Sequence, residues 1–286
     1  MKPAAFDYQR ADSAEVALAA LAELGGDARI LAGGQSLMAV MNMRLAQPKR
    51  LVDISRSAPL AQVRIDAGWL HIGAAATQAS VEWRPRLAQE LPLLALAFPH
   101  ISHFQIRNRG TVAGSIAHAD PSAELPLCLL ALEGEVLLRS AKRRRTVKAA
   151  DFFTGMLTTA RRDDEMIEAV RFPLARPGTG HGFEEFSMRH GDFAVCAVAA
   201  VADAKRLRIA VGGVADQAVA RDFPIPGGSA LGGAHKDELE DALNDFAWSL
   251  EARDEPQASA ALRRRLVREL GRRAAEQALA TRSHPA

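Results

Sequence analysis

The sequence predicts an α+β protein made of two or three packed units, and three observations favour this fold class. The chain has 286 residues, enough for several units with their own cores. A strand, helix, strand pattern fills its beginning, whereas hairpin-like and alternating strand patterns follow. The best linker in the chain is Pro177-Gly178-Thr179-Gly180-His181-Gly182. We therefore place a domain boundary there.

The first unit is expected to be a small α/β layer. Ser13 can cap a helix over 14–24, which Gly25-Gly26 then stops. A short buried strand at 29–32, an apolar helix at 37–45 and a strand at 51–54 complete the unit. The pattern then changes to a hairpin of 63–65 with 69–72, and to a helical segment at 81–101 that prolines interrupt.

The second half reads mainly as strands, followed by helices. Apolar or alternating runs occur at 125–132, 134–138, 145–147, 166–172, 183–188, 193–201 and 207–211. A turn is expected at Gly212-Gly213. The tail from 236 to 282 has a helical pattern in which Leu262, Leu266, Leu270 and Ala274 recur every four residues.

Composition narrows the possible functions. The chain is 48% hydrophobic and 24% charged, as in ordinary soluble globular proteins. A formal charge of +2 argues against a general nucleic-acid binder, so the basic runs 142–145 and 263–265 are interpreted as solvated surface. No apolar run has the roughly 20 residues of a membrane span and no signal segment precedes the first helix, so a cytoplasmic location is expected.

The chain carries few residues suited to metal binding. Its two cysteines, Cys128 and Cys196, lie in apolar runs and are too few for an iron-sulfur cluster, which needs about four thiolates. His100 and His103 are three residues apart but have no nearby carboxylate or cysteine cluster, so no metal site is predicted. The Rossmann, P-loop, His-Glu-x-x-His and Gly-x-Ser-x-Gly motifs are all absent from the sequence.

Two glycine-containing segments are the candidate binding elements. Gly33-Gly34-Gln35-Ser36 joins a strand to a helix, an arrangement that directs free N-H groups and the positive helix end toward an anion. A structural Gly-Gly turn is the alternative.

The second segment, 106–124, mixes glycines, hydroxyls and acids so irregularly that we expect a binding loop, with Gly110, Thr111, Gly114 and Ser115 close to a phosphate. His118 lies inside this segment and is expected to bond either a ligand oxygen or a protein group. Two such segments suit a ligand with two phosphates.

Four motifs, in this order, resemble the FAD-binding medium subunit of the molybdenum hydroxylases, the family of carbon monoxide dehydrogenase and the xanthine dehydrogenases. The motifs are Ala32-Gly33-Gly34-Gln35-Ser36-Leu37, Gly110 to Ser115 running into Ala117-His118-Ala119-Asp120-Pro121, Glu165 to Val170 before Phe172-Pro173, and Arg189-His190-Gly191-Asp192-Phe193-Ala194. The resemblance covers nearly the whole chain. It implies a PCMH-type FAD-binding domain at 1–176, with subdomains of about 1–57 and 58–176, and a smaller α/β flavoprotein C-terminal domain at 177–286.

The resemblance also implies which residues bind FAD. Ala32 to Ser36 and Thr111 to Ser115 would hold the pyrophosphate from two sides, and Glu124 would bond ribityl or ribose hydroxyls. Met166 and Ile167 would pack on the isoalloxazine ring, with Asp192 near the flavin. The full predicted set is Leu31, Ala32, Gly33, Gly34, Gln35, Ser36, Leu37, Ile101, Thr111, Ala113, Gly114, Ser115, His118, Asp120, Glu124, Met166, Ile167 and Asp192.

Three positions depart from the family pattern. Ala113 stands where a glycine is common, Leu262 stands at a tyrosine position, and Tyr8 is the single tyrosine of the chain. We expect Ala113 to make one backbone approach to the cofactor less close, and the other two departures to alter flavin exposure or the choice of electron acceptor rather than to prevent FAD binding.

The implied function is electron transfer. A large molybdopterin subunit would hydroxylate the substrate, a small [2Fe-2S] subunit would carry electrons to the FAD of this chain, and an external acceptor would receive them. A dimer of such heterotrimers is one arrangement that the resemblance allows. No residue of this chain is expected to touch the organic substrate. Two alternatives remain open: a stand-alone PCMH-type flavin oxidase or dehydrogenase, and a scaffold that has lost its flavin.

Overall fold

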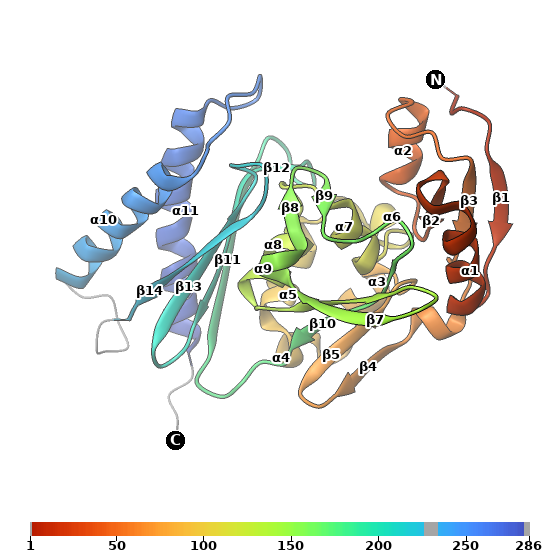
Figure 1. Cartoon of the computed structure of the whole chain (residues 1–286). Helices are drawn as coiled ribbons and strands as arrows, with labels where there is room; N and C mark the ends of the chain where they lie inside the picture. The colour runs from red at the N-terminus through yellow and green to blue at the C-terminus, as the bar shows by residue number, and fades with distance from the viewer. Residues whose placement is uncertain (1, 226–233, 283–286) are drawn as a thin grey trace.

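The computed structural model describes residues 2–225 and 234–282, and its elements form three consecutive regions (Figure 1). The N-terminal region contains β1 (Asp7–Arg10), α1 (Ala14–Leu24), β2 (Ala28–Leu31), α2 (Leu37–Asn42) and β3 (Arg50–Asp53), with the 3-10 turn η1 (Gly25–Asp27). Its three strands form a parallel sheet in the order β1-β3-β2. Ser13 caps α1 by accepting from Val16 N, as predicted.

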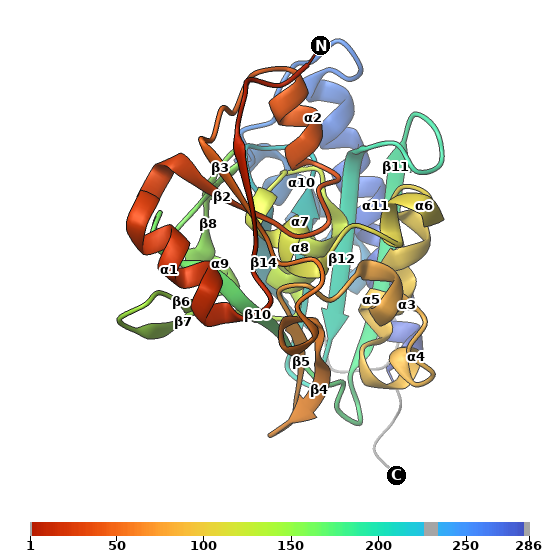
Figure 2. The same ribbon diagram turned by 90° about the vertical axis from the view of Figure 1, so that its right-hand side faces the viewer.

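The middle region is a mixed layer of short helices on a five-stranded antiparallel sheet, in the order β4-β5-β10-β6-β7. Its strands are β4 (Val63–Asp66), β5 (Trp69–Gly73), β6 (Glu135–Arg139), β7 (Arg144–Lys148) and β10 (Met166–Pro173), with the small pair β8 (Phe153–Gly155) and β9 (Thr158–Thr159). Its helices are α3 (Gln78–Glu82), α4 (Leu87–Glu90), α5 (Pro92–Ala97), α6 (Phe104–Arg107), α7 (Val112–His118), α8 (Glu124–Ala131) and α9 (Ala149–Phe152), with the turns η2 (Ala58–Ala61) and η3 (Phe98–His100). The β4-β5 hairpin and α2 lie at opposite ends of the molecule (Figure 1 and Figure 2).

The C-terminal region is a four-stranded antiparallel sheet in the order β11-β12-β13-β14. Its elements are β11 (Gly180–Ser187), β12 (Ala194–Ala202), β13 (Arg206–Gly212), β14 (Val219–Pro224), α10 (Ala234–Ser249) and α11 (Ala260–Thr281). The helices α10 and α11 cover one face of this sheet, and α5 and α8 of the middle region lie on the other (Figure 1). Side chains along β12 point alternately to the two faces of the sheet. Ala197 and Ala199 pack in the hydrophobic core of the middle region, called the middle core below, whereas Val198 packs in the core under α11.

The segment 106–124 is not the irregular loop that we predicted. It contains the whole of α7 and the end of α6. Val112, Ala113 and Ile116 bury one side of α7 in the middle core, and the glycine at position 114 does not stop the helix because Thr111 caps its first turn.

The predicted linker also differs from the observed structure, since Gly180 to Gly182 belong to strand β11. The glycines reflect close packing of α11. A Cβ on Gly180 would lie 2.6 Å from Arg282 N and nearer still to the carbonyl oxygen of Ala278, while one on Gly182 would lie 2.9 Å from the carbonyl carbon of Ala274.

The predicted buried stripe of α11 is confirmed at Leu270 and Ala274, and Leu266 packs against the same core, but the prediction was wrong at Leu262. Arg263, Val267, Leu270, Ala274 and Ala278 form the buried side, whereas Leu262 is 38% exposed. Arg263 is buried because it bonds the carbonyl of Val195, a partner that a periodicity argument does not include. The predicted strands at 29–32, 51–54, 63–65, 69–72, 134–138, 145–147 and 166–172 are confirmed within one or two residues, whereas β1, β8, β9 and β14 were missed.

Candidate functional site

The two glycine segments meet backbone to backbone. A Cβ on Gly33 would lie 2.7 Å from the Cα of Gly110 and nearer still to the carbonyl oxygen of Arg109. Real Cβ atoms do not approach that closely, so position 33 accepts only glycine without a shift of one segment. The two halves of the predicted clamp, 75 or so residues apart, are thus brought together by the fold.

The segment Gly33 to Ser36 presents unused hydrogen-bond donors. Within the described part of the chain, no acceptor is recorded for the N-H groups of these four consecutive residues. Gly34 adopts a left-handed φ of +75°, and the Gln35 side chain donates to the carbonyl of Gly33 at 3.0 Å. Consecutive free N-H groups around a left-handed residue form a concave anion-binding nest.

The second half of the clamp is the first turn of α7. The Thr111 hydroxyl accepts from Gly114 N at 2.9 Å, and a Cβ on Gly114 would lie 2.6 Å from that hydroxyl oxygen. Gln78 N donates to the carbonyl of Gly110 at 2.7 Å, which ties this turn to the segment after β5. The cap therefore depends on a glycine at 114 and is held in place by the middle sheet.

Two of the predicted residues pack in the hydrophobic core of the middle region, and their roles at the cofactor stay predictions. Ala113 is 3% exposed and Ile101 is 7% exposed, and both pack in the middle hydrophobic cluster. The methyl group of Ala113, the departure from the family pattern, therefore points into the protein and leaves the approach to the N-H groups open.

The far end of α7 leads to the predicted sugar-binding residues. His118 lies in the last turn of this seven-residue helix, which places it about 10 Å along the axis from Thr111. Asp120 accepts from Ser122 N at 2.8 Å and holds the turn before α8. Glu124 begins α8 and is 7% exposed. Burial, with a smaller contribution from Asp120, raises the pKa of Glu124 to about 7. The ligand roles of His118, Asp120 and Glu124 stay predictions.

The remaining predicted residues lie on other elements. Met166 is 1% exposed in the N-terminal core and Ile167 is 6% exposed in the middle core, both on β10. Asp192 is exposed in the turn between β11 and β12. Their roles at the isoalloxazine ring also stay predictions.

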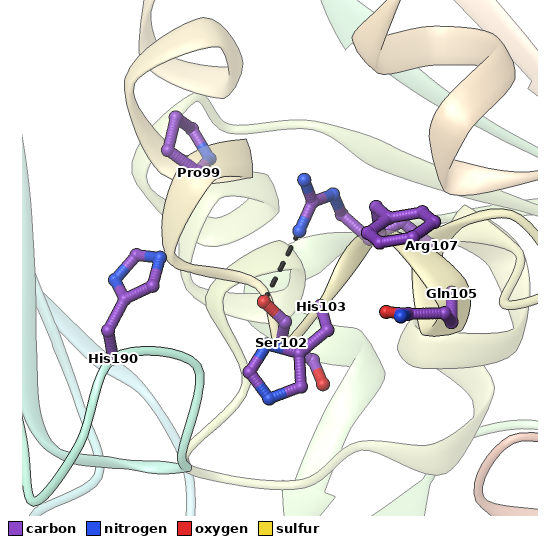
Figure 3. A pocket seen from close by; sticks show the side chains of 7 residues that line it. Pro99, Ser102, His103, Gln105, Arg107 and His190 are labelled. Atoms are coloured by element: carbon purple, nitrogen blue, oxygen red, sulfur yellow. Dashed lines mark hydrogen bonds between the residues drawn. The ribbon is translucent and has the colours of Figure 1, made fainter.

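A cavity of about 360 Å³ opens beside the turn between β11 and β12 (Figure 3). Segment 99–107 and His190 line it, and the Arg107 guanidinium bonds Glu82 at 2.7 and 2.9 Å and the carbonyl of Ser102 at 3.3 Å. His103 lines this cavity, whereas His100 approaches Glu185 instead. Across the described ranges, no cluster of three or more His, Cys, Asp or Glu side chains is suited to a metal ion.

Sequence reasoning missed several residues of the site. The Arg109 carbonyl faces Gly33, Gln78 supports Gly110, and Glu185 of β11 is buried, with the charge of Glu124 contributing to its raised pKa. None of the three belongs to a recognisable motif, because each acts through its place in the tertiary structure.

Comparison with known proteins agrees with this geometry. The family described as "FAD binding domain in molybdopterin dehydrogenase" matches residues 4–175. The 6-hydroxypseudooxynicotine dehydrogenase complex subunit alpha of Paenarthrobacter nicotinovorans is 43% identical over 70% of this chain and 68% of its own length. The nicotine 6-hydroxylase medium subunit of the same organism is 41% identical over 86% of this chain and 88% of its own length. The structure resembles carbon monoxide dehydrogenase from Hydrogenophaga pseudoflava with a TM-score of 0.90 and 31% identity, covering 99% of this chain and 100% of the other.

The fold and the two-sided cradle define an FAD-binding oxidoreductase subunit. The chain belongs to the FAD-binding medium subunits of the molybdenum hydroxylase family. FAD is the cofactor of this domain, and the residues of the cradle fit it, since unpaired N-H groups and a capped helix start suit a pyrophosphate. No helix among residues 2–225 and 234–282 has the length and hydropathy needed to cross a membrane.

Proposed function

We propose that this chain is the electron-transfer subunit of a heteromeric molybdenum hydroxylase. It receives electrons from iron-sulfur clusters on a small partner subunit and passes them to an external acceptor, while a large partner subunit holds the molybdopterin. Bound FAD supplies the one- and two-electron chemistry that connects cluster and acceptor. The observation that carries the proposal is the row of N-H groups at Gly33 to Ser36, which have no acceptor among residues 2–225 and 234–282 and lie where Gly33 approaches Gly110, just before the capped start of α7.

The chain's own residues position the cofactor. Gly33 to Ser36 bind the pyrophosphate through N-H groups, and the first turn of α7 adds its positive helix end from the other side. Glu124 forms hydrogen bonds with the ribityl or ribose hydroxyls, as an acceptor when ionised and also as a donor when protonated. Residues 1–176 form the FAD domain and 177–286 the C-terminal domain in this proposal.

The cysteines favour a divided complex. Cys128 and Cys196 are both fully buried, and burial raises the pKa of each thiol. Such thiols neither ligate a cluster nor form a covalent flavin link. The clusters must therefore lie on another chain, and the flavin is held without a bond to cysteine.

The test is to isolate the tagged chain with its native partners and measure flavin, molybdenum and iron per complex. We expect one FAD per copy of this chain, released into the supernatant by acid precipitation, with molybdenum and iron only in fractions that contain the partner subunits. A matched preparation of the Gly33→Val variant should keep the metals and lose the flavin.

Two results would contradict the proposal. Flavin that stays with the acid-precipitated chain, together with oxidase turnover by the chain alone, would indicate the stand-alone flavin oxidase. A chain that binds no FAD even at millimolar concentration would indicate a scaffold without a cofactor.

A further inference from the structure

A buried carboxylate lies between the middle region and the C-terminal sheet without a full set of partners. Glu185 on β11 has a side chain that is 2% exposed. Its Oε1 is 3.8 Å from His100 Nδ1, and its Oε2 is buried with no hydrogen-bond partner recorded among the described residues. An isolated buried carboxylate is costly, so such a group normally keeps a proton or serves a function.

A second buried acid, Glu124, lies at the start of α8, which packs on the same side of the C-terminal sheet. Glu185 is two residues from Phe183, on the side of β11 that joins the middle core, where α8 also packs. Glu124 opens α8, and its charge raises the pKa of Glu185. Both acids also raise the pKa of Cys128, which lies one turn further along α8. The two carboxyl groups therefore share one low-dielectric compartment.

Within residues 2–225 and 234–282, neither Glu185 nor Glu124 forms an ion pair with a lysine or arginine. Burial raises the pKa of Glu185 to about 8 and that of Glu124 to about 7. Burial, and then His190, lowers the pKa of His100, so this imidazole is neutral near pH 7. The other titratable or charged groups that act on this cluster are Cys128 on α8, Cys196 on β12, Asp120 before α8 and His190 in the turn between β11 and β12, while Arg263 on α11 acts on Cys196. Segment α5 is entirely apolar.

The pair lies at one end of the cofactor cradle. The chain runs from the capped start of α7 through His118 to Glu124, and Gly213 N donates to the carbonyl of Pro121 at 2.7 Å. This bond holds the turn before Glu124 against the C-terminal sheet that carries Glu185. The compartment therefore adjoins the part of the site where the sugar and ribityl hydroxyls are expected.

We propose that Glu185 and Glu124 form a proton-linked carboxyl pair, which binds a proton when electrons reach the flavin site and releases it when they leave. Glu185 acts on the flavin site only through its charge, and it does not contact the organic substrate. Added negative charge increases the proton affinity of a neighbouring buried acid, and linkage requires the converse, that protonation of the pair favours reduction. This inference rests on the proposed function.

The first experiment measures the midpoint potential of the FAD-loaded chain from pH 6 to 9, for wild type, Glu185→Gln and Glu184→Gln. Glu184 is the matched control, because it is the adjacent acid on the same strand and its strand partner Val198 lies in the core under α11. One proton bound with two electrons adds about 30 mV per pH unit to the slope. We expect the Glu185→Gln slope to be shallower by up to this amount and the Glu184→Gln slope to equal that of wild type. Equal slopes in all three proteins at full FAD occupancy would overturn the inference.

The second experiment needs neither FAD nor a stable variant. Infrared spectra of the wild-type chain without cofactor should show a protonated-carboxyl band that persists at pH 7 and disappears toward pH 9. Absence of this band at pH 7 would overturn the inference even if Glu185→Gln does not fold. Loss of FAD binding in wild type would instead overturn the proposed function, and the infrared result would still report on the pair.

Discussion

The carbonyl of Arg109 lies in the space that a side chain on Gly33 would need. Two segments far apart in the chain thus touch through their backbones, and four N-H groups beside the contact remain unpaired within the described residues. The closeness of these segments is the basis for the two-sided pyrophosphate cradle that we propose.

We predict that Gly33→Val abolishes FAD binding. Separating the segments removes at least two hydrogen bonds to a charged group, each contributing about 1.5 to 3 kcal/mol, so affinity should fall by more than about 100-fold. Flavin fluorescence during FAD titration measures the loss. Gly68→Val is the control, because Gly68 lies in an open hairpin turn with φ +82° and no atom near its Cβ position. It should strain its turn and still bind FAD, and FAD binding by Gly33→Val at wild-type affinity would contradict the role of the contact.

Replacing the cap of α7 should weaken the cradle without destroying the fold. Thr111→Val keeps the side-chain shape but removes the acceptor for Gly114 N, which costs about 1 kcal/mol of stability and frays the first turn. We expect weaker FAD affinity in calorimetric titrations. Ser259→Ala removes the equivalent cap of α11 in the C-terminal region, where the hydroxyl accepts from Leu262 N at 3.2 Å, and should cost similar stability while leaving FAD affinity unchanged. Similar affinity losses in both variants would mean that general destabilisation, not the cap, is responsible.

The glycines of β11 should be essential for packing of the C-terminal region. Gly182→Ala places a methyl group against the backbone of α11 at Ala274, so the helix must shift and stability should fall by about 1 to 3 kcal/mol or more. Chemical denaturation measures the change. Gly26→Ala is the control, since its methyl group would meet only the flexible side chain of Asp163 at 3.3 Å. If the two substitutions have the same small effect on stability, the close approach of α11 does not require glycine at position 182.

Acid should destabilise the protein partly through His181. Burial lowers the pKa of His181 from 6.5 to about 4, so the unfolded chain binds a proton between these values that the folded chain does not. The free energy of unfolding therefore falls as the pH is lowered from 6.5 toward 4. The contribution of His181 to this loss is about 2 kcal/mol at pH 5. The His181→Leu variant should be less sensitive to acid. The difference between its free energy of unfolding and that of wild type should therefore increase by about 2 kcal/mol in favour of the variant when the pH is lowered from 8 to 5. A difference that is constant with pH would refute this explanation.

Local sequence determined much of what was predicted. Strands β2 and β3 of the N-terminal unit, the hairpin and the strand before Pro173 follow from apolar periodicity and turn residues, which act over a few positions. The Gly33 to Ser36 segment was recognised for the same reason, because a strand, glycines and a helix start are adjacent in the chain.

The errors arose where distant packing decides the structure. A glycine and hydroxyl segment became the buried helix α7 because its alanine, valine and isoleucine side chains join a core that a local pattern does not reveal. Gly180 and Gly182 resembled a linker, yet they are strand residues that make room for α11 from about 95 positions further along the chain.

The sequence by itself determined the cofactor class through its resemblance to a flavoprotein family, and it predicted two glycine segments as halves of a cradle, since each segment is a local motif with its own backbone chemistry. Only the tertiary structure decided that Gly33 touches the Arg109 carbonyl, that Ala113 faces inward, and that Glu185 is buried near Glu124. These relationships join elements that are far apart in the chain, and they depend on how the middle and C-terminal regions pack together.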